Sequence, residues 1–510
     1  MAQLWSMFTK RNSYNVFAMI SKKNFRQSRF YYFKKHSGFL KAIFIECFLS
    51  INKRTLFLFL IISFFLFNSL YKLDQNMVFI GDQGWFYLSA RDMVLNHNIP
   101  LVGITSSHTW LHQGPLWTYF LSLAFLLFSF NPLSGAYITI FFGGLSIILI
   151  YILGKEIRDE KLGLITALLY SVSPLVVFYS RFPYHTSLIP FFVLLLLFFL
   201  FRWIKEKLAY FPLIILVFGL LYNLELATFS LVISVILVEI YGLFKKKQWA
   251  IGIFNRKTIF FSFVSFLISM LPILVYDLQN GFKQTLVFSG WIIYKPIAFL
   301  LNSSGTFSIE KLSNLLKFLL QNLNSLLFSL PSIFSILLLM SSVAFLIYLR
   351  KRERQSEGLS LLILLLFLVF FSTLTLLVNM TVSDAYLPMF FPMIIILISF
   401  FVYSLFKIAR AIAFMLIFIF LVLSLWTTYK YNGRDLGKRI NASREIIKLS
   451  QGKQYTIEGK GIGSEFESFT ANYEYLTWWL GHGPSKKEEK LKFYIEENSS
   501  RIQVEEKIRR

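Results

Sequence analysis

Cysteine is almost absent from this sequence, since Cys47 is the only one among 510 residues. A single thiol cannot form a disulfide within the chain and cannot supply a thiolate-rich metal cluster. Acidic residues are also scarce, at 27 against 51 Lys and Arg, and charged residues of both signs make up only 15% of the chain. The composition therefore excludes a disulfide-stapled fold and a soluble domain with an ordinary charged surface.

Apolar residues are abundant and come in long runs. They make up 56% of the chain, and mean hydropathy is +0.61. The runs are roughly 17–22 residues long, the length that a helix needs to cross the core of a bilayer. The sequence therefore predicts an all-α polytopic membrane protein with about eleven transmembrane helices. We expect these spans near 55–71, 134–154, 161–179, 188–203, 209–223, 226–244, 258–276, 326–349, 359–378, 387–405 and 410–428.

The net charge of +24 lies in clusters between the apolar runs. Lys and Arg collect on the cytoplasmic side of membrane proteins, so these clusters require no nucleic-acid partner. Residues 1–54 carry about eleven basic residues against one acid, which predicts a cytoplasmic segment followed by an uncleaved anchor. Segments 72–133 and 277–325 then become the two long external loops. The polar region 429–510 is expected outside the membrane as a small mixed cap.

The apolar run at 115–131 is ambiguous, because about 17 residues is the short limit for a span. If this run crossed the membrane, the basic clusters after it would all lie outside. If it lies in the outer interface, every later basic cluster falls in the cytoplasm. We therefore predict an interfacial helix here. The protein is then an integral protein of the plasma (inner) membrane, with a cytoplasmic N-terminus and an external C-terminus.

The first external loop begins with an acidic motif, GDQGWFYLSARD, which contains Asp82. Gly81 and Gly84 allow the backbone to approach a ligand closely. A carboxylate held among aromatic residues at the membrane surface can act as a general base. The alternative is a helix-capping role, because Asp82 precedes a predicted helix at 84–95.

Two histidines follow in TSSHTWLHQGPLWTYF. His108 and His112 are four residues apart, a spacing that would place both on one face of a helix and could bind a metal. Gly114 and Pro115 instead favour a loop, with a helix that starts only at Pro115. Neither a thiol nor a clear third ligand is present, so a divalent metal has no evident ligand set, and a polar loop or substrate contact is the simpler interpretation.

An arginine occupies the next external loop, in SRFPYHTSLIPFF. The guanidinium of Arg181 can bind the oxygens of a lipid-linked phosphate in pairs, and the alternative is snorkelling towards lipid headgroups. Later loops place charged and aromatic residues at the same side of the membrane, and each could be an interface anchor: Asp277, Lys283, Asp384 and Tyr386.

Several motifs together resemble one superfamily, the C-type glycosyltransferases (GT-C), which use polyprenyl-phosphate sugars. The chain is similar to protein O-mannosyltransferases and lipid A aminoarabinose transferases over about residues 55–430, and most strongly over 79–192. The segments that carry the resemblance occur in order: GDQGWFYLSARDMV, NIPLVGITSS with HQGPLWTYFLSLAFLLF, LGKEIRDEKLGLITALLYSVSPLVVFYSRFPYHTSLIPFF, PILVYDLQNGF and YLPMFFPMIIIL. Two departures stand out. Many relatives have Asp-Glu where this chain has Asp82-Gln83, and Gln113 is inserted in the His-Gly-Pro-Leu motif.

The resemblance implies a GT-C-like transmembrane catalytic domain at 55–428. It implies transfer of a hexose or pentose from a polyprenyl-phosphate donor to a hydroxyl of a lipid, protein or glycan acceptor, on the outer face and with inversion. Asp82 would be the base and Arg181 would bind the donor phosphate. Further contacts to the donor phosphate or sugar are expected from Tyr184, His185, His112, Arg91 and Lys283. This scheme needs no nucleotide, and it leaves open a divalent metal, for which the sequence offers no clear ligand set.

Two other functions fit a polytopic chain. A transporter or flippase of a lipid-linked sugar would be marked by charges at the bilayer midplane and by broken helices. The main charges within the predicted spans are Glu225 and Glu239, and both lie near span ends. A non-catalytic scaffold is the third possibility.

Overall fold

The computed structural model describes residues 53–105, 111–205, 207–301, 308–327, 331–353, 356–379, 383–430, 436–497 and 502–508. The chain divides near residue 60, and residues 61–510 form one compact unit that contains the bundle and the cap. Helix α3 (Lys53–Leu70) runs across this division. The predicted basic segment 1–54 lies almost entirely outside the described residues.

The apolar runs of the sequence are helical in the structure. Among the described residues, nine helices are long and apolar enough to cross a membrane. They are α3, α7 (Ser134–Ile157), η1 with α10 (His185–Ile204), η3 with α12 (Leu226–Phe244), α14 (Arg256–Gln279), α17 (Ser332–Arg352), α18 (Glu357–Asn379), η6 with α19 (Asp384–Ile408) and α20 (Arg410–Lys430). Large apolar side chains on α14 are more than half exposed, among them Phe260, Phe263 and Ile268, which suits a lipid-facing surface.

Two further apolar runs are helical without meeting that length. The run predicted at 161–179 forms α8 (Glu160–Val172) and α9 (Pro174–Ser180), which meet at an angle of 66° and would count as a tenth span if they act together. The bend follows from sequence, because a residue before proline avoids the helical conformation, and Ser173 has an extended ψ of 125°. The run predicted at 209–223 is α11 (Phe211–Leu224), a shorter helix preceded by η2 (Leu208–Tyr210).

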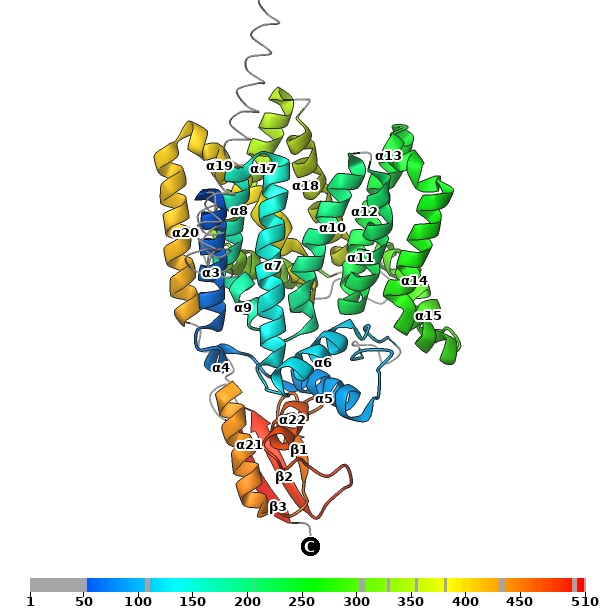
Figure 1. The fold of residues 1–510 in the computed structure, drawn as a ribbon, viewed down its shortest axis with the longest axis vertical. Coiled ribbons are helices and arrows are strands. Elements are labelled where there is room, and N and C mark those ends of the chain that lie inside the picture. The colour runs from blue at the N-terminus through cyan, green and yellow to red at the C-terminus, as the bar shows by residue number, and fades with distance from the viewer. Residues whose placement is uncertain are drawn as a thin grey trace, which may run out of the picture. The chain divides into compact units, whose positions relative to one another are not determined.

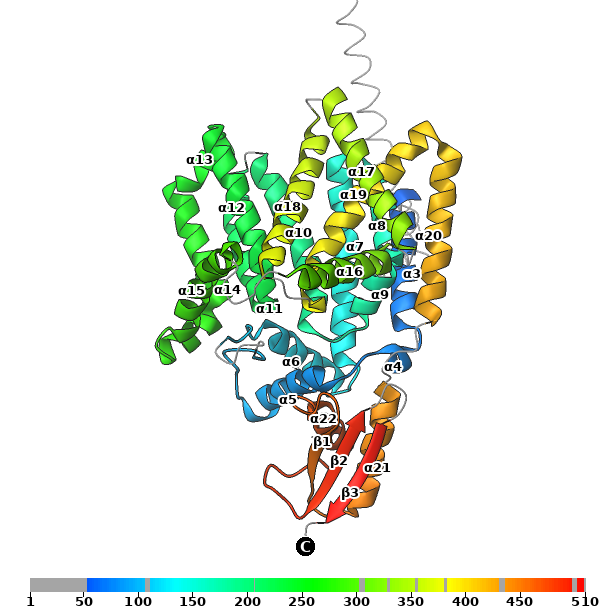
Figure 2. The same cartoon turned by 180° about the vertical axis from the view of Figure 1, so that it is seen from behind.

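Short helices lie across one end of the bundle, between it and the C-terminal region, in both views (Figures 1 and 2). They are α5 (Gly81–Asn96) and α6 (Leu116–Phe128), with α4 (Leu73–Asn76) before them. Helix α6 begins directly after Pro115, as predicted. Its 13 residues extend about 20 Å at 1.5 Å per residue, too short for a hydrocarbon core of about 30 Å. The geometry therefore agrees with an interfacial position for α6.

The segment expected as the second long loop contains two helices, α15 (Lys283–Leu300) and α16 (Ile309–Leu326). Figure 2 shows α16 lying across the bundle rather than along it. Asp277, at the end of α14, is fully buried and accepts hydrogen bonds from the backbone N–H groups of Gln284 and Thr285, each at 3.0 Å. Its carboxylate therefore satisfies the first donors of α15, and we assign it a capping role. Two short elements, α13 (Gln248–Ile251) and η4 (Gly252–Phe254), connect α12 to α14.

The C-terminal region is a small mixed cap, as predicted. It contains α21 (Leu436–Ser450), β1 (Thr456–Lys460), α22 (Ala471–Trp479), β2 (Leu491–Glu497) and β3 (Ile502–Ile508). The sheet order is β1-β2-β3, with β1 and β2 parallel (Thr456 beside Lys492) and β2 and β3 antiparallel (Leu491 beside Ile508). A parallel pair needs a crossover, and α22 lies within it. The cap has an apolar core of its own, which includes Ile446, Tyr455, Tyr473 and Phe493.

Candidate active site

Asp82 lies in the first turn of α5, and its carboxylate is not used to cap that helix. Gln83 Oε1 instead accepts a hydrogen bond from the backbone N–H of Ile80 at 2.8 Å and caps the helix. The geometry therefore gives no support to the capping alternative for Asp82. Gln83 is fully buried and holds the start of α5. Asp82 is left to interact with residues distant in sequence.

Two hydroxyl groups donate to the half-buried Asp82 carboxylate. Tyr184 Oη donates to Oδ2 at 3.1 Å, and Ser468 Oγ of the cap donates to Oδ1 at 2.6 Å. Burial raises the pKa of Tyr184 well above its usual value, and the neighbouring Asp82 charge raises it further. Tyr184 therefore remains a protonated donor at neutral pH. Together the two bonds fix the direction of a carboxylate that sequence alone placed only at the membrane surface.

The cap approaches Asp82 through the two glycines of its motif. A Cβ on Gly81 would lie 2.2 Å from the backbone oxygen of Ser468, and one on Gly84 would lie 2.0 Å from the backbone N of Asn472. The close approach expected at these glycines is therefore to the backbone of the cap. Asn472 Nδ2 also donates to the backbone oxygen of Phe79 at 3.0 Å. Only glycine permits this contact, and through it Ser468 reaches the carboxylate.

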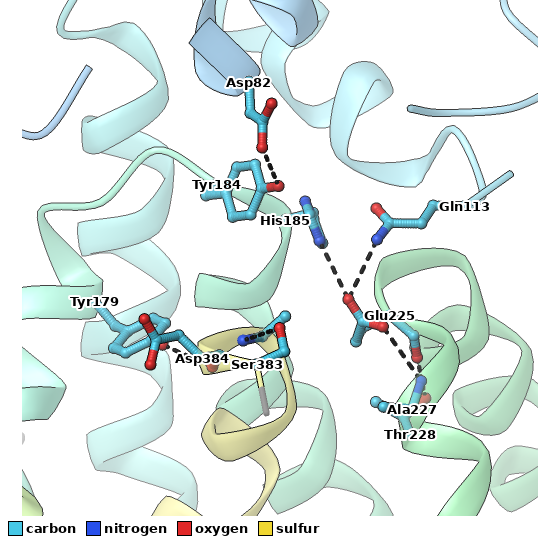
Figure 3. Close-up of polar contacts among 11 residues, drawn as sticks. Asp82, Gln113, Tyr179, Tyr184, His185, Glu225, Ala227, Thr228, Ser383 and Asp384 are labelled. Atoms are coloured by element: carbon cyan, nitrogen blue, oxygen red, sulfur yellow. Dashed lines mark hydrogen bonds and ion pairs between the residues drawn. The ribbon is translucent and has the colours of Figure 1, made fainter. Parts of the chain in front are cut away.

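A second polar group lies beside Tyr184, inside the bundle (Figure 3). His185 Nε2 is 3.5 Å from Glu225 Oε2, and Gln113 Nε2 donates to the same oxygen at 3.2 Å. All three side chains are buried. The sequence marked His185 as a candidate, but it indicated Glu225 only as a charge near the end of a span and Gln113 only as an insertion. Nothing in the pattern showed that these three would meet.

The Arg181 guanidinium contacts the end of α3 in the structure. Its Nε donates to the backbone oxygen of Ser69 at 3.3 Å, and its Nη2 donates to the backbone oxygen of Asn68. The side chain is buried, and burial lowers its pKa to about 10, so the guanidinium remains charged at neutral pH. Arg181 thus satisfies carbonyls at the C-terminal end of α3, where a positive charge is favoured.

The remaining predicted contacts are spread around α5, α6 and α15. The backbone N–H of His112 donates to Gln284 Oε1 at 3.1 Å, and partial burial lowers the pKa of the His112 imidazole. Arg91 pairs with Asp92 at 2.6 Å and lies over the ring of Trp478 in the cap. Lys283 is exposed at the start of α15. The structure thus brings Tyr184 to Asp82 but places these three residues in other surroundings.

The other sequence candidates lie in later loops or outside the described residues. Asp384 begins η6, and its backbone oxygen accepts a hydrogen bond from Tyr179 Oη at 2.9 Å (Figure 3). Tyr386 lies within the same short helix. His108 falls outside the described residues. Over the residues that the structure describes, no three His, Cys, Asp or Glu side chains are grouped closely enough to hold a metal ion.

Comparison with known proteins finds one matching family. The family model for dolichyl-phosphate-mannose-protein mannosyltransferases matches residues 112–276, a segment that contains Arg181, Tyr184, His185 and Glu225. Among curated protein sequences, none matches this chain.

Solved structures share the fold. ArnT from Cupriavidus metallidurans bound to undecaprenyl phosphate has a TM-score of 0.55 at 10% identity, with 87% of this chain and 93% of that chain covered. An oligosaccharyltransferase from Archaeoglobus fulgidus in complex with Zn and sulfate has a TM-score of 0.51 at 15% identity, with 82% and 61% covered. This chain thus spans about three fifths of that oligosaccharyltransferase.

The likeness to these solved structures shows that the chain has the GT-C fold. The part of the chain from His112 to Tyr276 is similar to the dolichyl-phosphate-mannose-protein mannosyltransferases. The expected fold class is confirmed, and the described residues account for nine or ten of the roughly eleven expected spans.

Proposed function

We propose that this chain transfers a sugar from a polyprenyl-phosphate donor to an acceptor hydroxyl on the outer face of the plasma (inner) membrane, with inversion at the anomeric carbon. The observation that carries the proposal is the Asp82 carboxylate, oriented by Tyr184 and Ser468 at the end of the bundle where α5 meets the cap. The donor class is supported by the undecaprenyl phosphate bound to ArnT from Cupriavidus metallidurans.

The reaction needs a base on the acceptor side. The acceptor oxygen forms a bond to the anomeric carbon while the bond from that carbon to the phosphate oxygen breaks, and the electron pair leaves with the phosphate. Asp82 accepts the proton of the acceptor hydroxyl in this step. The hydroxyls of Tyr184 and Ser468 occupy one position on each carboxylate oxygen, and the remaining lone pairs stay available for the acceptor.

The donor phosphate needs a cation that offsets its growing charge. We assign this role to Arg181, which is charged, buried and three residues before Tyr184 in the chain. Binding of the phosphate then exchanges contacts with the α3 carbonyls for charge-assisted bonds to phosphate oxygens, which are about twice as strong as neutral ones. His112, Arg91, Lys283, Tyr184 and His185 complete the proposed donor-binding set.

The acceptor is a hydroxyl of a lipid, a protein or a glycan. The Archaeoglobus fulgidus oligosaccharyltransferase has been solved tethered to an acceptor peptide, with a TM-score of 0.50 at 13% identity and 83% of this chain and 63% of that chain covered. In our proposal the cap reaches the acceptor side of Asp82 through Ser468, so the cap contributes to acceptor choice.

The alternative of a transporter or flippase has one feature in its favour, the bend between α8 and α9. That bend is explained locally by Ser173 and Pro174, and the Glu225 carboxylate has protein partners near the end of α11. An assay of sugar release or transfer distinguishes the two functions, because a flippase moves the lipid-linked sugar without breaking the sugar–phosphate bond.

The test uses the full chain in lipid nanodiscs with radiolabelled undecaprenyl-phosphate hexoses and pentoses, and measures release or transfer of the sugar. Asp82→Asn should lower turnover by about 10²–10⁴-fold, the usual contribution of a general base. Asp74→Asn is the matched control, because Asp74 is exposed in the neighbouring α4 and has no part in the proposed site. Normal turnover in a folded Asp82→Asn protein would show that Asp82 is not the base.

A further inference from the structure

Three buried polar side chains meet beside the proposed base. Gln113, His185 and Glu225 have only 8%, 1% and 6% of their surface exposed, and they come from the loop before α6, from η1 and from the end of α11. Glu225 Oε1 accepts the backbone N–H of Ala227 at 3.3 Å, so one carboxylate oxygen is fixed by the chain. The other oxygen, Oε2, faces Gln113 and His185 (Figure 3).

Several polar atoms of this group have no hydrogen-bond partner among the described residues. Neither ring nitrogen of His185 forms a hydrogen bond with the described residues, although Nε2 is 3.5 Å from Glu225 Oε2. The amide oxygen Oε1 of Gln113 also has no partner there. Leaving a buried polar group unpaired is destabilising, and native proteins rarely retain several such groups together without a reason.

The backbone of Gln113 is held in place by hydrogen bonds. Its backbone N–H donates to the backbone oxygen of Ile104 at 3.1 Å, and its backbone oxygen accepts from the N–H of Gly103 at 2.7 Å. The following N–H, of Gly114, donates to the backbone oxygen of Asn223 at 3.0 Å. Gln113 is therefore built into the fold, with its side-chain amide directed at Glu225.

The group is directly connected to the proposed base. The rings of Tyr184 and His185 have centroids 3.9 Å apart, and Tyr184 Oη donates to Asp82. Phe86, on α5, packs against both rings. Tyr184 thus contacts both the proposed base and His185, and it links the two groups.

We propose that Gln113, His185 and Glu225 bind hydroxyl groups of the transferred sugar and determine which sugar the enzyme accepts. The inference rests on the proposed function, because it assumes that a sugar lies next to Asp82. Carboxylate and amide oxygens accept hydrogen bonds from sugar hydroxyls, and an imidazole both donates and accepts. A site built to pair with a hydroxyl strongly rejects an analogue that lacks it, since its own buried groups are then left unpaired.

The experiment measures binding, so that it does not depend on turnover. The full chain carrying Asp82→Asn, in nanodiscs, is titrated with bare undecaprenyl phosphate and with undecaprenyl-phosphate mannose, glucose, galactose and arabinose. We expect one sugar donor to bind at least about tenfold more tightly than its epimers, since one hydrogen bond to a charged group is worth about 1.5–3 kcal/mol. Equal affinity for all of the sugar donors would overturn the proposal.

Single substitutions then identify which residues distinguish one sugar from another. Glu225→Gln should weaken binding of the preferred sugar donor by about 10- to 100-fold and leave binding of bare undecaprenyl phosphate unchanged. Gln113→Asn, which shortens the side chain by one carbon, should reduce the preference in the same direction. Glu239→Gln is the matched control, because Glu239 is a partly buried carboxylate of α12 outside this group.

Two outcomes would overturn the sugar-binding role. In one, Glu225→Gln weakens binding of bare undecaprenyl phosphate as much as binding of the sugar donors, as a purely structural role would. In the other, Glu225→Gln leaves the preference among sugars intact, as expected if water alone satisfies these groups. Neither outcome bears on Asp82 as the base, which the turnover assay tests separately.

Discussion

Gly84→Ala tests whether the cap is part of the active site. The new Cβ would lie 2.0 Å from the backbone N of Asn472 and 2.3 Å from the carbonyl carbon of Ala471. Ordinary contacts between heavy atoms begin near 3.5 Å, so α22 has to move by about 1.5 Å. Backbone atoms cannot rotate away as the end of a side chain can, so the movement displaces the cap as a whole.

The size of the effect follows from the contacts that this movement breaks. Ser468 donates to Asp82, Asn472 donates to the backbone oxygen of Phe79, and Tyr475 Oη donates to the backbone oxygen of Phe130 at 2.6 Å. The loss of three hydrogen bonds of about 1 kcal/mol each, together with about 1–3 kcal/mol for overpacking, weakens docking of the cap by about 4–6 kcal/mol. The cap keeps its own apolar core, so the loss concerns docking rather than folding of the cap.

The assay combines turnover with hydrogen–deuterium exchange. In Gly84→Ala we expect turnover to fall and exchange to rise in residues 79–96 and 468–480, while the strands of the cap remain protected. Gly144→Ala is the control, since its Cβ would meet nothing within 4 Å. Turnover and exchange equal to those of the unmodified protein would refute the argument that the contact between α5 and α22 organises the site.

Two other predictions address the donor and the membrane. Arg181→Ala should weaken binding of undecaprenyl phosphate. It should also lower thermal stability, because the carbonyls of Asn68 and Ser69 lose their hydrogen-bond donor. Unchanged affinity for undecaprenyl phosphate in a folded variant would show that Arg181 does not bind the phosphate. Asn98→Cys, in a chain where Cys47 is replaced by Ser, should react with a membrane-impermeant maleimide in intact cells, since Asn98 is exposed in the first loop. Labelling only after lysis would place that loop in the cytoplasm and contradict sugar transfer on the outer face.

The sequence by itself determined the class of fold. A run of apolar residues long enough to cross a bilayer must satisfy its backbone internally, and only a helix does this within one segment. For that reason the runs in the sequence match helices in the structure, including α6, whose start is determined by Pro115. The Ser173–Pro174 pair also indicates the bend between α8 and α9, because proline restricts the backbone conformation of the residue just before it.

The composition of the site was decided only by tertiary structure. Asp82 and Arg181 are visible as isolated charges in apolar surroundings, but local sequence does not state what they contact. The hydroxyl of Ser468 reaches Asp82 across 386 positions, and Gln113 reaches Glu225 across 112. These contacts result from packing between α5 and the cap and between the loop before α6 and the end of α11. No periodicity in the sequence encodes such a meeting, because it depends on where whole helices lie in space.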